Sequence, residues 1–339
     1  MTGTIVLDPY PRPLELIFTA DSRARLAALG PVAWHDGPPL ADDDVEALLP
    51  DTFAVVGQTS LPKERLDRAP RLRAIVNVEG NFLPNVDYGE CFRRGIEVLC
   101  ISPVFGLPVA EMALGLALAA ARDIPRGDAE IRVGSETLYD DGANEDSFLL
   151  TGRTLGLVGC GNLGRTLLPL LRPFGGPLLV HDPWLQHAVV RGLGAEPVGL
   201  DELFARSRVV FVLAAVTTEN QGLIGASQLA AMAPGSVVVL VSRAAVVDWH
   251  ALLDAAESRR LKVAIDVFPE EPIPGEERAR GVTGTVLSAH RAGNVPEIWP
   301  SVGEMVVDDL EWIVRGLPPQ RLQRAQPGTV GRLRSKPVG

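Results

Sequence analysis

The feature that most constrains the fold is a glycine-rich run near the middle of the chain, Gly159-Cys-Gly161-Asn-Leu-Gly164. It follows an apolar stretch, TLGLVG, and opens a segment with helical periodicity, RTLLPLLRPF. A G-x-G-x-x-G spacing between a strand and a helix lets the backbone approach a pyrophosphate at the helix N-terminus. A second apolar stretch, PLLVHD, ends about twenty residues later in Asp182, whose carboxylate suits ribose hydroxyls and repels a 2′-phosphate. The run therefore predicts a site for NAD rather than NADP.

The glycine-rich run belongs to a long series in which short apolar strands alternate with helical segments. From residue 154 onwards we expect the strands TLGLVG, PLLVHD, RVVFVLA, SVVVLVS, KVAIDV and TVLSAH, which make a complete dinucleotide-binding sheet. In the first hundred residues we expect the strands TFAVVG, LRAIVNV and IEVLC, with the helical segments ADDDVEALLP, PKERLDRAP and VDYGECFRRG. This alternation predicts parallel sheets covered on both faces, and 339 residues suffice for two such domains.

Two longer helices are expected, at residues 108–122 and at residues 301–315. The first is rich in small residues (AEMALGLALAAAR), which predicts close packing against another helix. The longest apolar stretch, residues 112–121, falls short of the roughly 20 residues that span a bilayer. The first residues, MTGTIVLDPYPRP, lack the pattern of a signal peptide, so we expect a cytoplasmic protein without a membrane partner.

Charge and cysteine content narrow the classes of partner. The formal net charge of −10 argues against nucleic acid, whose phosphates require a basic face. The three cysteines, Cys91, Cys100 and Cys160, are too few and too scattered for a disulfide framework or a metal site. The basic segment from Arg321 to Lys336 is expected to be a poorly ordered tail, or alternatively a segment that docks on a partner subunit.

Three charged residues stand where strands of the second series end. Arg243 follows SVVVLVS, Glu271 follows KVAIDVFPE, and His290 ends TVLSAH. Each has an ordinary alternative: a surface arginine, a glutamate in a solvated loop, a structural histidine. Because the carboxyl ends of parallel strands border the ligand crevice, the three residues are nevertheless expected to converge near the cofactor. Glu270 is a weaker candidate for the role of Glu271.

The order of these segments resembles the D-isomer-specific 2-hydroxyacid dehydrogenases, the family of D-3-phosphoglycerate dehydrogenase and glyoxylate/hydroxypyruvate reductase. The resemblance covers roughly residues 50 to 315. It rests on the pieces LRAIVNVEGNFLPNVD, RGIEVLCISP, PVAE, GLVGCGNLGR, VHDPW, MAPGSVVVLVSRAAVVDWHAL, AIDVFPEEP and LSAHRAG. It implies an α/β fold of two doubly wound domains, in which a Rossmann NAD-binding domain (104–290) is inserted into a flavodoxin-like substrate domain (1–103 and 291–339).

The resemblance also implies roles for individual residues. It makes Arg243, Glu271 and His290 the catalytic set, and it assigns the substrate to Gly80, Asn81, Phe82, Phe105 and Arg243. It assigns the cofactor to Gly159, Gly161, Asn162, Leu163, Gly164, Asp182, Ala215, Ser242, Asp266 and Gly293. No metal is expected.

The chemistry of a 2-oxo acid explains these residue types. The planar fork of Arg243 suits a carboxylate and polarises the neighbouring carbonyl. His290 would donate a proton to the carbonyl oxygen in reduction and accept one from the hydroxyl in oxidation, and an adjacent Glu271 favours the imidazolium. The activity implied is NAD-dependent interconversion of a 2-oxo acid and its D-2-hydroxy acid. Two alternatives stay open, a phosphonate or other unusual acid as substrate and a non-catalytic NAD-binding regulator. A homodimer is expected from the resemblance.

The sequence departs from the family pattern around the expected substrate loop and cofactor site. Phe82 stands where the loop usually has a second glycine, and Phe105 matches a position that is usually polar, so both are expected to narrow the pocket or to make it more apolar. Ala244 replaces a glycine, Leu240 an asparagine, and Leu213-Ala214-Ala215 a His-x-Pro at the adenine wall. Glu79 precedes the loop. If it points inward, it would repel an anionic substrate or select a cationic or hydroxylated tail; if it faces solvent, it does neither.

Overall fold

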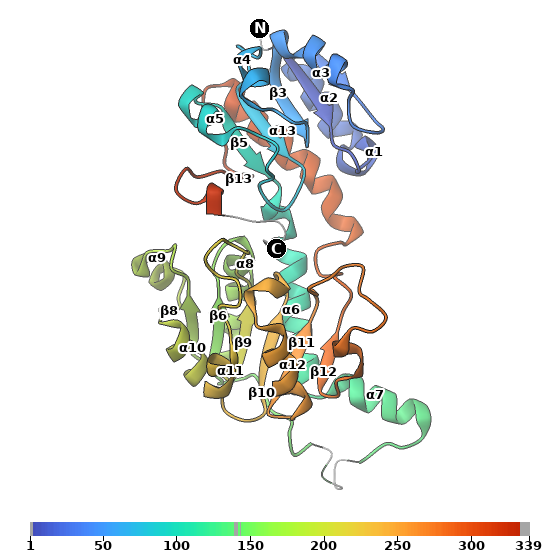
Figure 1. Ribbon diagram of the computed structural model, residues 1–339, viewed down its shortest axis with the longest axis vertical. Coiled ribbons are helices and arrows are strands. Elements are labelled where there is room, and N and C mark those ends of the chain that lie inside the picture. Colours follow the sequence, from blue (N-terminus) through green and yellow to red (C-terminus); the bar gives the residue numbers. More distant parts are fainter. Residues whose placement is uncertain (1–2, 139–141, 143, 333–339) are drawn as a thin grey trace. The chain divides into compact units, whose positions relative to one another are not determined.

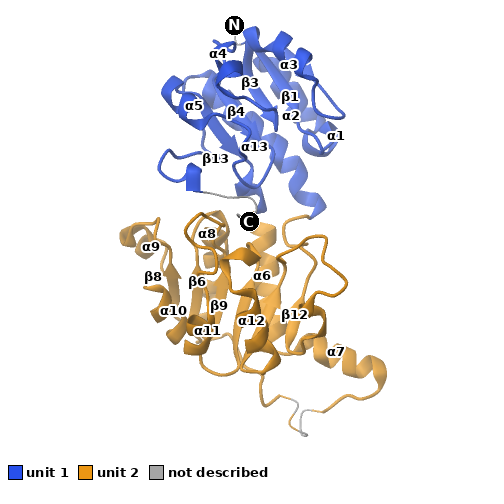
Figure 2. Cartoon of the chain, in the orientation of Figure 1, with its two compact units in different colours: residues 1–105, 295–338 blue, residues 106–294, 339 orange. Residues whose placement is uncertain are grey.

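The chain divides into two compact units, each built around its own parallel sheet. The computed structural model describes residues 3–138, 142 and 144–332. Unit 1 consists of residues 1–105 and 295–338, and unit 2 of residues 106–294, as Figure 2 shows. The boundaries expected after residues 103 and 290 lie close to those of the two units.

Unit 1 has a six-stranded sheet in the order β13-β5-β4-β3-β1-β2. The strands are β1 (Thr4–Asp8), β2 (Val32–Trp34), β3 (Thr52–Gly57), β4 (Ala74–Asn77), β5 (Glu97–Cys100) and β13 (Gln323–Arg324). All pairs are parallel except β13 with β5. The first five strands follow the flavodoxin-like order, whose chain direction across the sheet reverses between β1 and β3. The expected strands β3, β4 and β5 are confirmed, whereas β1, β2 and β13 were not predicted.

Helices cover both faces of this sheet, and apolar side chains fill the layers between. They are α1 (Leu14–Ile17), α2 (Ala20–Leu29), α3 (Asp42–Leu48), α4 (Lys63–Asp67), α5 (Tyr88–Arg94) and α13 (Trp299–Val314), with 3₁₀ turns η1 (Leu49–Asp51), η2 (Ser102–Phe105), η7 (Pro296–Ile298) and η8 (Val330–Arg332). α13 comes from the second chain segment of the unit and packs against α1 and α2 (Figure 1).

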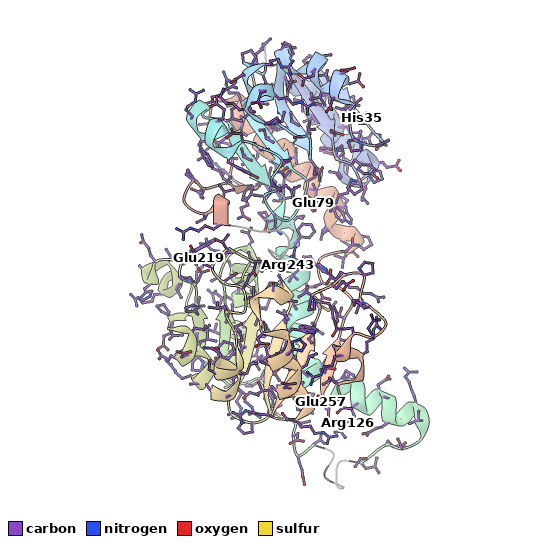
Figure 3. All side chains as sticks on the ribbon, in the orientation of Figure 1. His35, Glu79, Arg126, Glu219, Arg243 and Glu257 are labelled. Atoms are coloured by element: carbon purple, nitrogen blue, oxygen red, sulfur yellow. The ribbon has the colours of Figure 1, made fainter. Side chains whose placement is uncertain are left out.

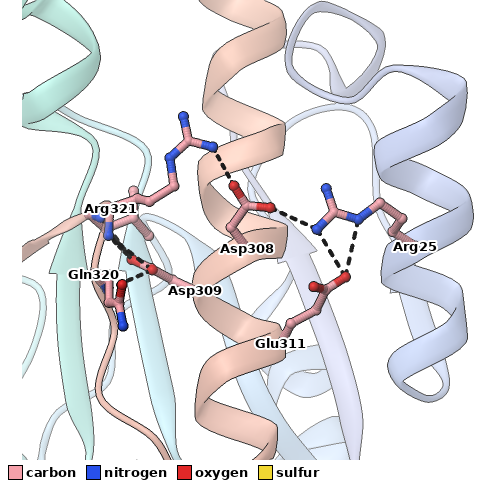
Figure 4. Close-up of polar contacts among 7 residues, drawn as sticks. Arg25, Asp308, Asp309, Glu311, Gln320 and Arg321 are labelled. Carbon is pink, nitrogen blue, oxygen red and sulfur yellow. Dashed lines mark hydrogen bonds and ion pairs between the residues drawn. The ribbon is translucent and has the colours of Figure 1, made fainter.

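Two aspartates on α13 bind the chain segment that follows this helix (Figure 4). Asp309 is fully buried, and its carboxylate accepts hydrogen bonds from the backbone N–H groups of Gln320 (2.8 Å), Arg321 (3.0 and 3.1 Å) and Leu322 (2.7 Å). Asp308 accepts from Arg25 (2.7 Å) and also pairs with Arg321. The expectation of a poorly ordered basic tail is therefore wrong for residues 321–332, because Asp309, the β5 pairing and the burial of Ala325 and Val330 in the core fix them. Arg334 and Lys336 lie outside the described residues.

Unit 2 has a seven-stranded parallel sheet in the order β12-β11-β10-β9-β6-β7-β8. The strands are β6 (Leu155–Val158), β7 (Leu178–His181), β8 (Glu196–Pro197), β9 (Val209–Val212), β10 (Ser236–Leu240), β11 (Leu261–Ile265) and β12 (Thr285–Leu287). The chain reverses its direction across the sheet between β6 and β9. All six strands expected in this half are confirmed, and the two-residue β8 is added at the edge.

The helices of unit 2 are α6 (Gly106–Ala121), α7 (Ile124–Val133), α8 (Asn162–Leu171), α9 (His187–Gly192), α10 (Leu200–Arg206), α11 (Ala226–Ala231) and α12 (Trp249–Glu257), and its 3₁₀ turns are η4 (Arg172–Phe174), η5 (Ala244–Val246) and η6 (Arg278–Gly281). They lie on both faces of the sheet in Figure 1. The prediction of an α/β fold with two doubly wound sheets, one of them a Rossmann sheet, is confirmed.

The small residues of α6 serve packing inside unit 2. α6 contacts α8, β10 and β11, and a Cβ built on Gly106 would lie 2.7 Å from Thr166 Oγ1. The predicted contact with another helix is thus confirmed. The apolar stretch lies within the 20 helical residues Ser102–Ala121, which are long and apolar enough to cross a membrane by length and composition alone. Half of that stretch is buried within the protein, as in a core helix.

Candidate active site

The glycine-rich loop lies at the point where the unit 2 sheet reverses. Gly159 follows β6 with φ +92°, and a Cβ built on it would lie 2.7 Å from Ala214, which follows β9. A side chain here would collide with backbone, so the loop requires glycine. Gly161 is the N-cap of α8, and a Cβ built on it would meet nothing within 4 Å. The loop therefore leaves an open approach to the N-terminus of a ten-residue helix, the usual place for a pyrophosphate.

Asp182 lies beside this loop, at the carboxyl end of β7. Its Oδ2 accepts a hydrogen bond from Cys160 N (2.7 Å), and its Oδ1 accepts one from Trp184 N (2.9 Å). A carboxylate has about four acceptor sites, so both oxygens retain capacity for hydroxyl donors. The contact with Cys160 joins the expected ribose carboxylate directly to the glycine-rich loop.

The other expected cofactor residues also follow strand ends of unit 2. Asn162, Leu163 and Gly164 form the first turn of α8, Ala215 follows β9, Ser242 follows β10, Asp266 follows β11 and Gly293 follows β12. Ser242 Oγ is buried without a hydrogen-bond partner. Such groups are rare in folded proteins unless water or a ligand satisfies them. A dinucleotide fits this arrangement of the unpartnered Ser242 hydroxyl, the glycine-rich loop and Asp182.

His290 and Glu271 form a hydrogen-bonded pair. Nδ1 of His290 lies 2.6 Å from Oε2 of Glu271, and Oε1 of Glu271 accepts from Phe268 N (3.0 Å). The imidazole is 44% exposed and the glutamate side chain 32%, so the pair faces accessible space. Glu271, rather than Glu270, is thus the partner of the histidine.

Asp266 fixes the backbone of the loop that carries His290. Its carbonyl oxygen accepts from His290 N (2.7 Å), and its fully buried carboxylate accepts from Arg291 N (2.9 Å) and Ala292 N (3.1 Å). His290 has φ +50°, a left-handed conformation that non-glycine residues adopt only when their surroundings hold them there. These three hydrogen bonds supply that restraint.

The His290–Glu271 pair borders a pocket of about 410 Å³. The lining residues are Glu271, Pro272, Ile273, Arg280, Ala289 and His290. Arg280 donates to the carbonyl oxygens of Pro274 (2.9 Å) and Ile273 (3.1 Å) and so clamps the chain that follows Glu271. Arg280 was not predicted, because no sequence motif marks an arginine that binds backbone carbonyls.

Arg243 follows β10 at the same edge of the unit 2 sheet. Figure 3 labels it at one end of this unit, with Arg126 and Glu257 at the other. Its Nη1 donates to the carbonyl oxygen of its neighbour Ser242 (2.7 Å). The structure thus brings the glycine-rich loop, Arg243 and the His290–Glu271 pair to the carboxyl edge of one sheet.

The expected substrate loop lies in unit 1, after β4. Gly80 and Asn81 are partly exposed, but the ring of Phe82 is buried in the core and packs edge-on against Tyr88 at 6.3 Å. The expectation that this ring narrows the pocket is therefore wrong, because the side chain points into the hydrophobic core. Phe105 is partly exposed and packs edge-on against Trp299 at 6.2 Å.

Glu79 is paired with a cation, and its side chain is 31% exposed. Arg12 Nη1 and Nη2 lie 2.5 and 3.2 Å from its two carboxylate oxygens. Arg12 is 67 residues away in sequence, so no local motif indicates the pair.

The cysteines are free and buried. Burial raises the pKa of the Cys160 thiol to about 11, and it raises the pKa values of Cys91 and Cys100 to about 12. All three are therefore neutral at physiological pH and unsuited to nucleophilic chemistry.

Comparison with known proteins identifies the family. The domain described as D-isomer specific 2-hydroxyacid dehydrogenase, NAD binding domain, matches residues 114–292. The chain is 30% identical to a glyoxylate reductase from Thermococcus litoralis, over 81% of this chain and 84% of the relative. It is 31% identical to a D-3-phosphoglycerate dehydrogenase from Mycobacterium bovis over 89% of its own length, which spans only 57% of that relative.

A solved structure supports the same assignment. The crystal structure of a phosphoglycerate oxidoreductase from Rhizobium etli is similar with a TM-score of 0.86 and 38% identity, covering 96% of this chain and 98% of that one. The predicted family and NAD as its cofactor are both confirmed. The chain belongs to the D-isomer specific 2-hydroxyacid dehydrogenase family, and residues 114–292 are its NAD-binding domain.

Proposed function

We propose that the protein is an NAD-dependent oxidoreductase that interconverts a 2-oxo acid and its D-2-hydroxy acid. The observation that carries this proposal is the His290–Glu271 pair, in which a partly exposed imidazole is held at 2.6 Å by a carboxylate. The pair lies at the carboxyl edge of the unit 2 sheet, as does the glycine-rich loop.

His290 is the proposed acid and base. Because Glu271 engages Nδ1, Nε2 is the ring nitrogen left to exchange a proton with the substrate oxygen. In the reductive direction Nε2 would donate its proton to the carbonyl oxygen, while Glu271 holds the imidazole ring in place. Glu271 is itself fixed by Phe268 N and, through its loop, by Arg280.

Arg243 is the proposed anchor for the substrate carboxylate. A guanidinium binds a carboxylate through two parallel hydrogen bonds and stays charged at any physiological pH. Bound NAD supplies the hydride acceptor or donor, and the residues proposed to hold it are those of the glycine-rich loop with Asp182 and Ser242. In unit 1, we assign to the backbone of Gly80, Asn81 and Phe82 a role in holding the substrate carboxylate, with Phe105 beside them.

Loss of His290 tests the mechanism. We expect the His290→Ala variant to lower kcat by about 10²–10⁴-fold, the usual contribution of a general acid, while the Kd of NADH stays within about twofold. The assay is NADH oxidation with glyoxylate, hydroxypyruvate, pyruvate and bulkier 2-oxo acids. His250→Ala removes an exposed histidine at the start of α12 and is the matched control.

The outcomes separate the candidate functions. Turnover by His290→Ala within tenfold of the wild type would reject the acid–base role. If the wild-type protein binds NADH but reduces no 2-oxo acid, the oxidoreductase proposal fails. Turnover of phosphonate analogues in the same assay then indicates an unusual acid as substrate, and its absence a non-catalytic NAD-binding regulator.

We also propose a cytoplasmic homodimer that has no nucleic-acid or membrane partner. Helix α7 supports the dimer, because it exposes three large apolar side chains. These are Ile124 (57% exposed), Ile131 (68%) and Val133 (77%). Large apolar side chains that gather in one exposed segment are typical of a contact surface. Sedimentation equilibrium on the wild type and on an Ile131→Asp/Val133→Asp variant tests this, and an unchanged mass would reject it.

A further inference from the structure

The ion pair between Arg12 and Glu79 is a built feature of unit 1. Arg12 follows β1 and Glu79 follows β4, and the two carboxylate oxygens face the two ends of the guanidinium fork at 2.5 and 3.2 Å. The side chains are only 19% and 31% exposed, and Gln58 Nε2 donates to the same carboxylate (3.4 Å). A bidentate pair with this much burial is screened less by solvent than an ordinary surface ion pair.

Aromatic rings connect this pair to the expected substrate loop. The guanidinium carbon of Arg12 lies 5.2 Å from the centre of the Trp299 ring, which packs against Phe105. A Cβ built on Gly80 would lie 3.3 Å from Phe105 Cε2. Contacts therefore run from Glu79 through Arg12, Trp299 and Phe105 back to Gly80, the next residue in sequence. Two opposite charges and two rings therefore lie next to the start of the loop.

The pairing sets the electrostatics at this loop. An uncompensated Glu79 would repel any acid held by the adjacent backbone, and Arg12 cancels that repulsion. An uncompensated Arg12 would attract a second anionic group, and Glu79 occupies its fork instead. What remains next to the loop is a neutral pair and apolar ring surface, which neither repels a single carboxylate nor offers a partner to another anion.

We propose that the Arg12–Glu79 pair selects 2-oxo acids whose tail is uncharged and discriminates against tails that carry a phosphate or a second carboxylate. This selection rests on the proposed function. Glu79 acts here by occupying Arg12, not by touching the tail, and an anionic tail must displace it before it gains a cation. The substrate class is thus a monoanionic 2-oxo acid, although relatives are named for phosphoglycerate.

Opposite changes in the two single variants test the selection. The measurement is kcat/KM for 2-oxobutanoate, 3-phosphohydroxypyruvate and 2-oxoglutarate. Glu79→Gln keeps the shape of the side chain and frees the charge of Arg12. We expect it to raise kcat/KM for the two acids with charged tails, relative to 2-oxobutanoate, by about tenfold. Arg12→Leu leaves Glu79 uncompensated, and we expect KM to rise about tenfold for all three acids.

Conservative and matched variants separate selection from mere structural damage. Arg12→Lys keeps the positive charge but loses the fork, and we expect it to recover most of the KM lost in Arg12→Leu. Arg71→Leu breaks an ion pair with Asp51 at the opposite end of β4, and it should change none of the three values.

Each outcome decides one question. If 2-oxobutanoate is reduced but Glu79→Gln leaves the preference unchanged, the selection is rejected and the proposed function stands. A wild-type preference for 3-phosphohydroxypyruvate over 2-oxobutanoate would also overturn the selection. If no 2-oxo acid is reduced although NADH binds, the proposed function fails and the selection fails with it.

Discussion

The two units use the same architecture to different ends, and the difference lies at the points where their sheets reverse. In unit 2 the reversal lies between β6 and β9, where Gly159 and Gly161 lead into α8, a helix of ten residues whose N-cap is open. In unit 1 it lies between β1 and β3. The helix after β1 has only four residues there, and Asp36 Oδ1 already accepts from Leu14 N (3.1 Å) at its start.

A glycine lies near the point of reversal in both sheets, but its structural role differs. A Cβ built on Gly57 at the end of β3 would lie 1.9 Å from the carbonyl oxygen of Asp8, so this glycine lets two strands of unit 1 close on each other. Gly159 also packs against backbone, but the chain after it turns away and leaves the helix N-terminus accessible. A doubly wound sheet thus provides a crevice, and the chain after the first strand decides whether a dinucleotide fits there.

The largest effect is expected from Gly57→Ala. Gly57 has φ +150° and no room for a Cβ, so the variant must shift β1 or β3. We expect the free energy of unfolding of unit 1 to fall by about 3 kcal/mol or more. Urea unfolding and hydrogen exchange of residues 4–8 and 52–57 measure this. Gly89→Ala in α5, where a Cβ meets only Asp87 Oδ1 at 3.5 Å, is the control. If Gly57→Ala weakened NADH binding but left the hydrogen-exchange protection of unit 1 unchanged, the contrast between the units would be contradicted.

A smaller effect, and on binding rather than folding, is expected from Gly159→Ala. The added Cβ would push the glycine-rich loop away from Ala214. We expect the Kd of NADH to rise about thirtyfold, which corresponds to about 2 kcal/mol. Fluorescence titration with NADH measures it, and Gly192→Ala in α9, where a Cβ meets nothing within 4 Å, should bind NADH normally. Unchanged affinity in Gly159→Ala would remove this loop from the cofactor site.

The smallest effect concerns the charges that hold α13 in unit 1. Burial raises the pKa of Asp308, but hydrogen bonds from Arg25 and Arg321 outweigh it, so the pKa lies below its ordinary 3.8. A carboxyl whose pKa is lowered by folding stabilises the protein above its unfolded pKa, and the contribution disappears as pH falls through the folded pKa. We expect Asp308→Asn to cost up to about 1 kcal/mol between pH 5 and 7, and less below about pH 3.8. Urea unfolding at several pH values tests this, and a cost that grows on acidification would refute it.

Much of unit 2 was predictable because its strands are apolar and its motifs are local. Arg243, Glu271 and His290 each follow a strand, and parallel topology alone brings strand ends to one edge. In unit 1, β1 and the three-residue β2 were not predicted. Phe82 was misjudged, because an aromatic residue in a loop gives no sign of whether it faces a pocket or the core. The Arg12–Glu79 pair joins residues that the fold, not the sequence, brings together.

The antiparallel pairing of β13 with β5 has a consequence for the order of folding during synthesis. Unit 2 is continuous, so all of its strands have left the ribosome once residue 294 and a short following segment have emerged. Unit 1 has its first five strands by residue 100, but it still lacks α13 and the edge strand that Asp309 anchors. Because domains fold as their residues become available, the N-terminal half must wait, with one face of its sheet covered only by α1 and α2, until α13 and β13 are made. Premature termination after residue 294 would therefore leave a complete unit 2 joined to an incomplete unit 1.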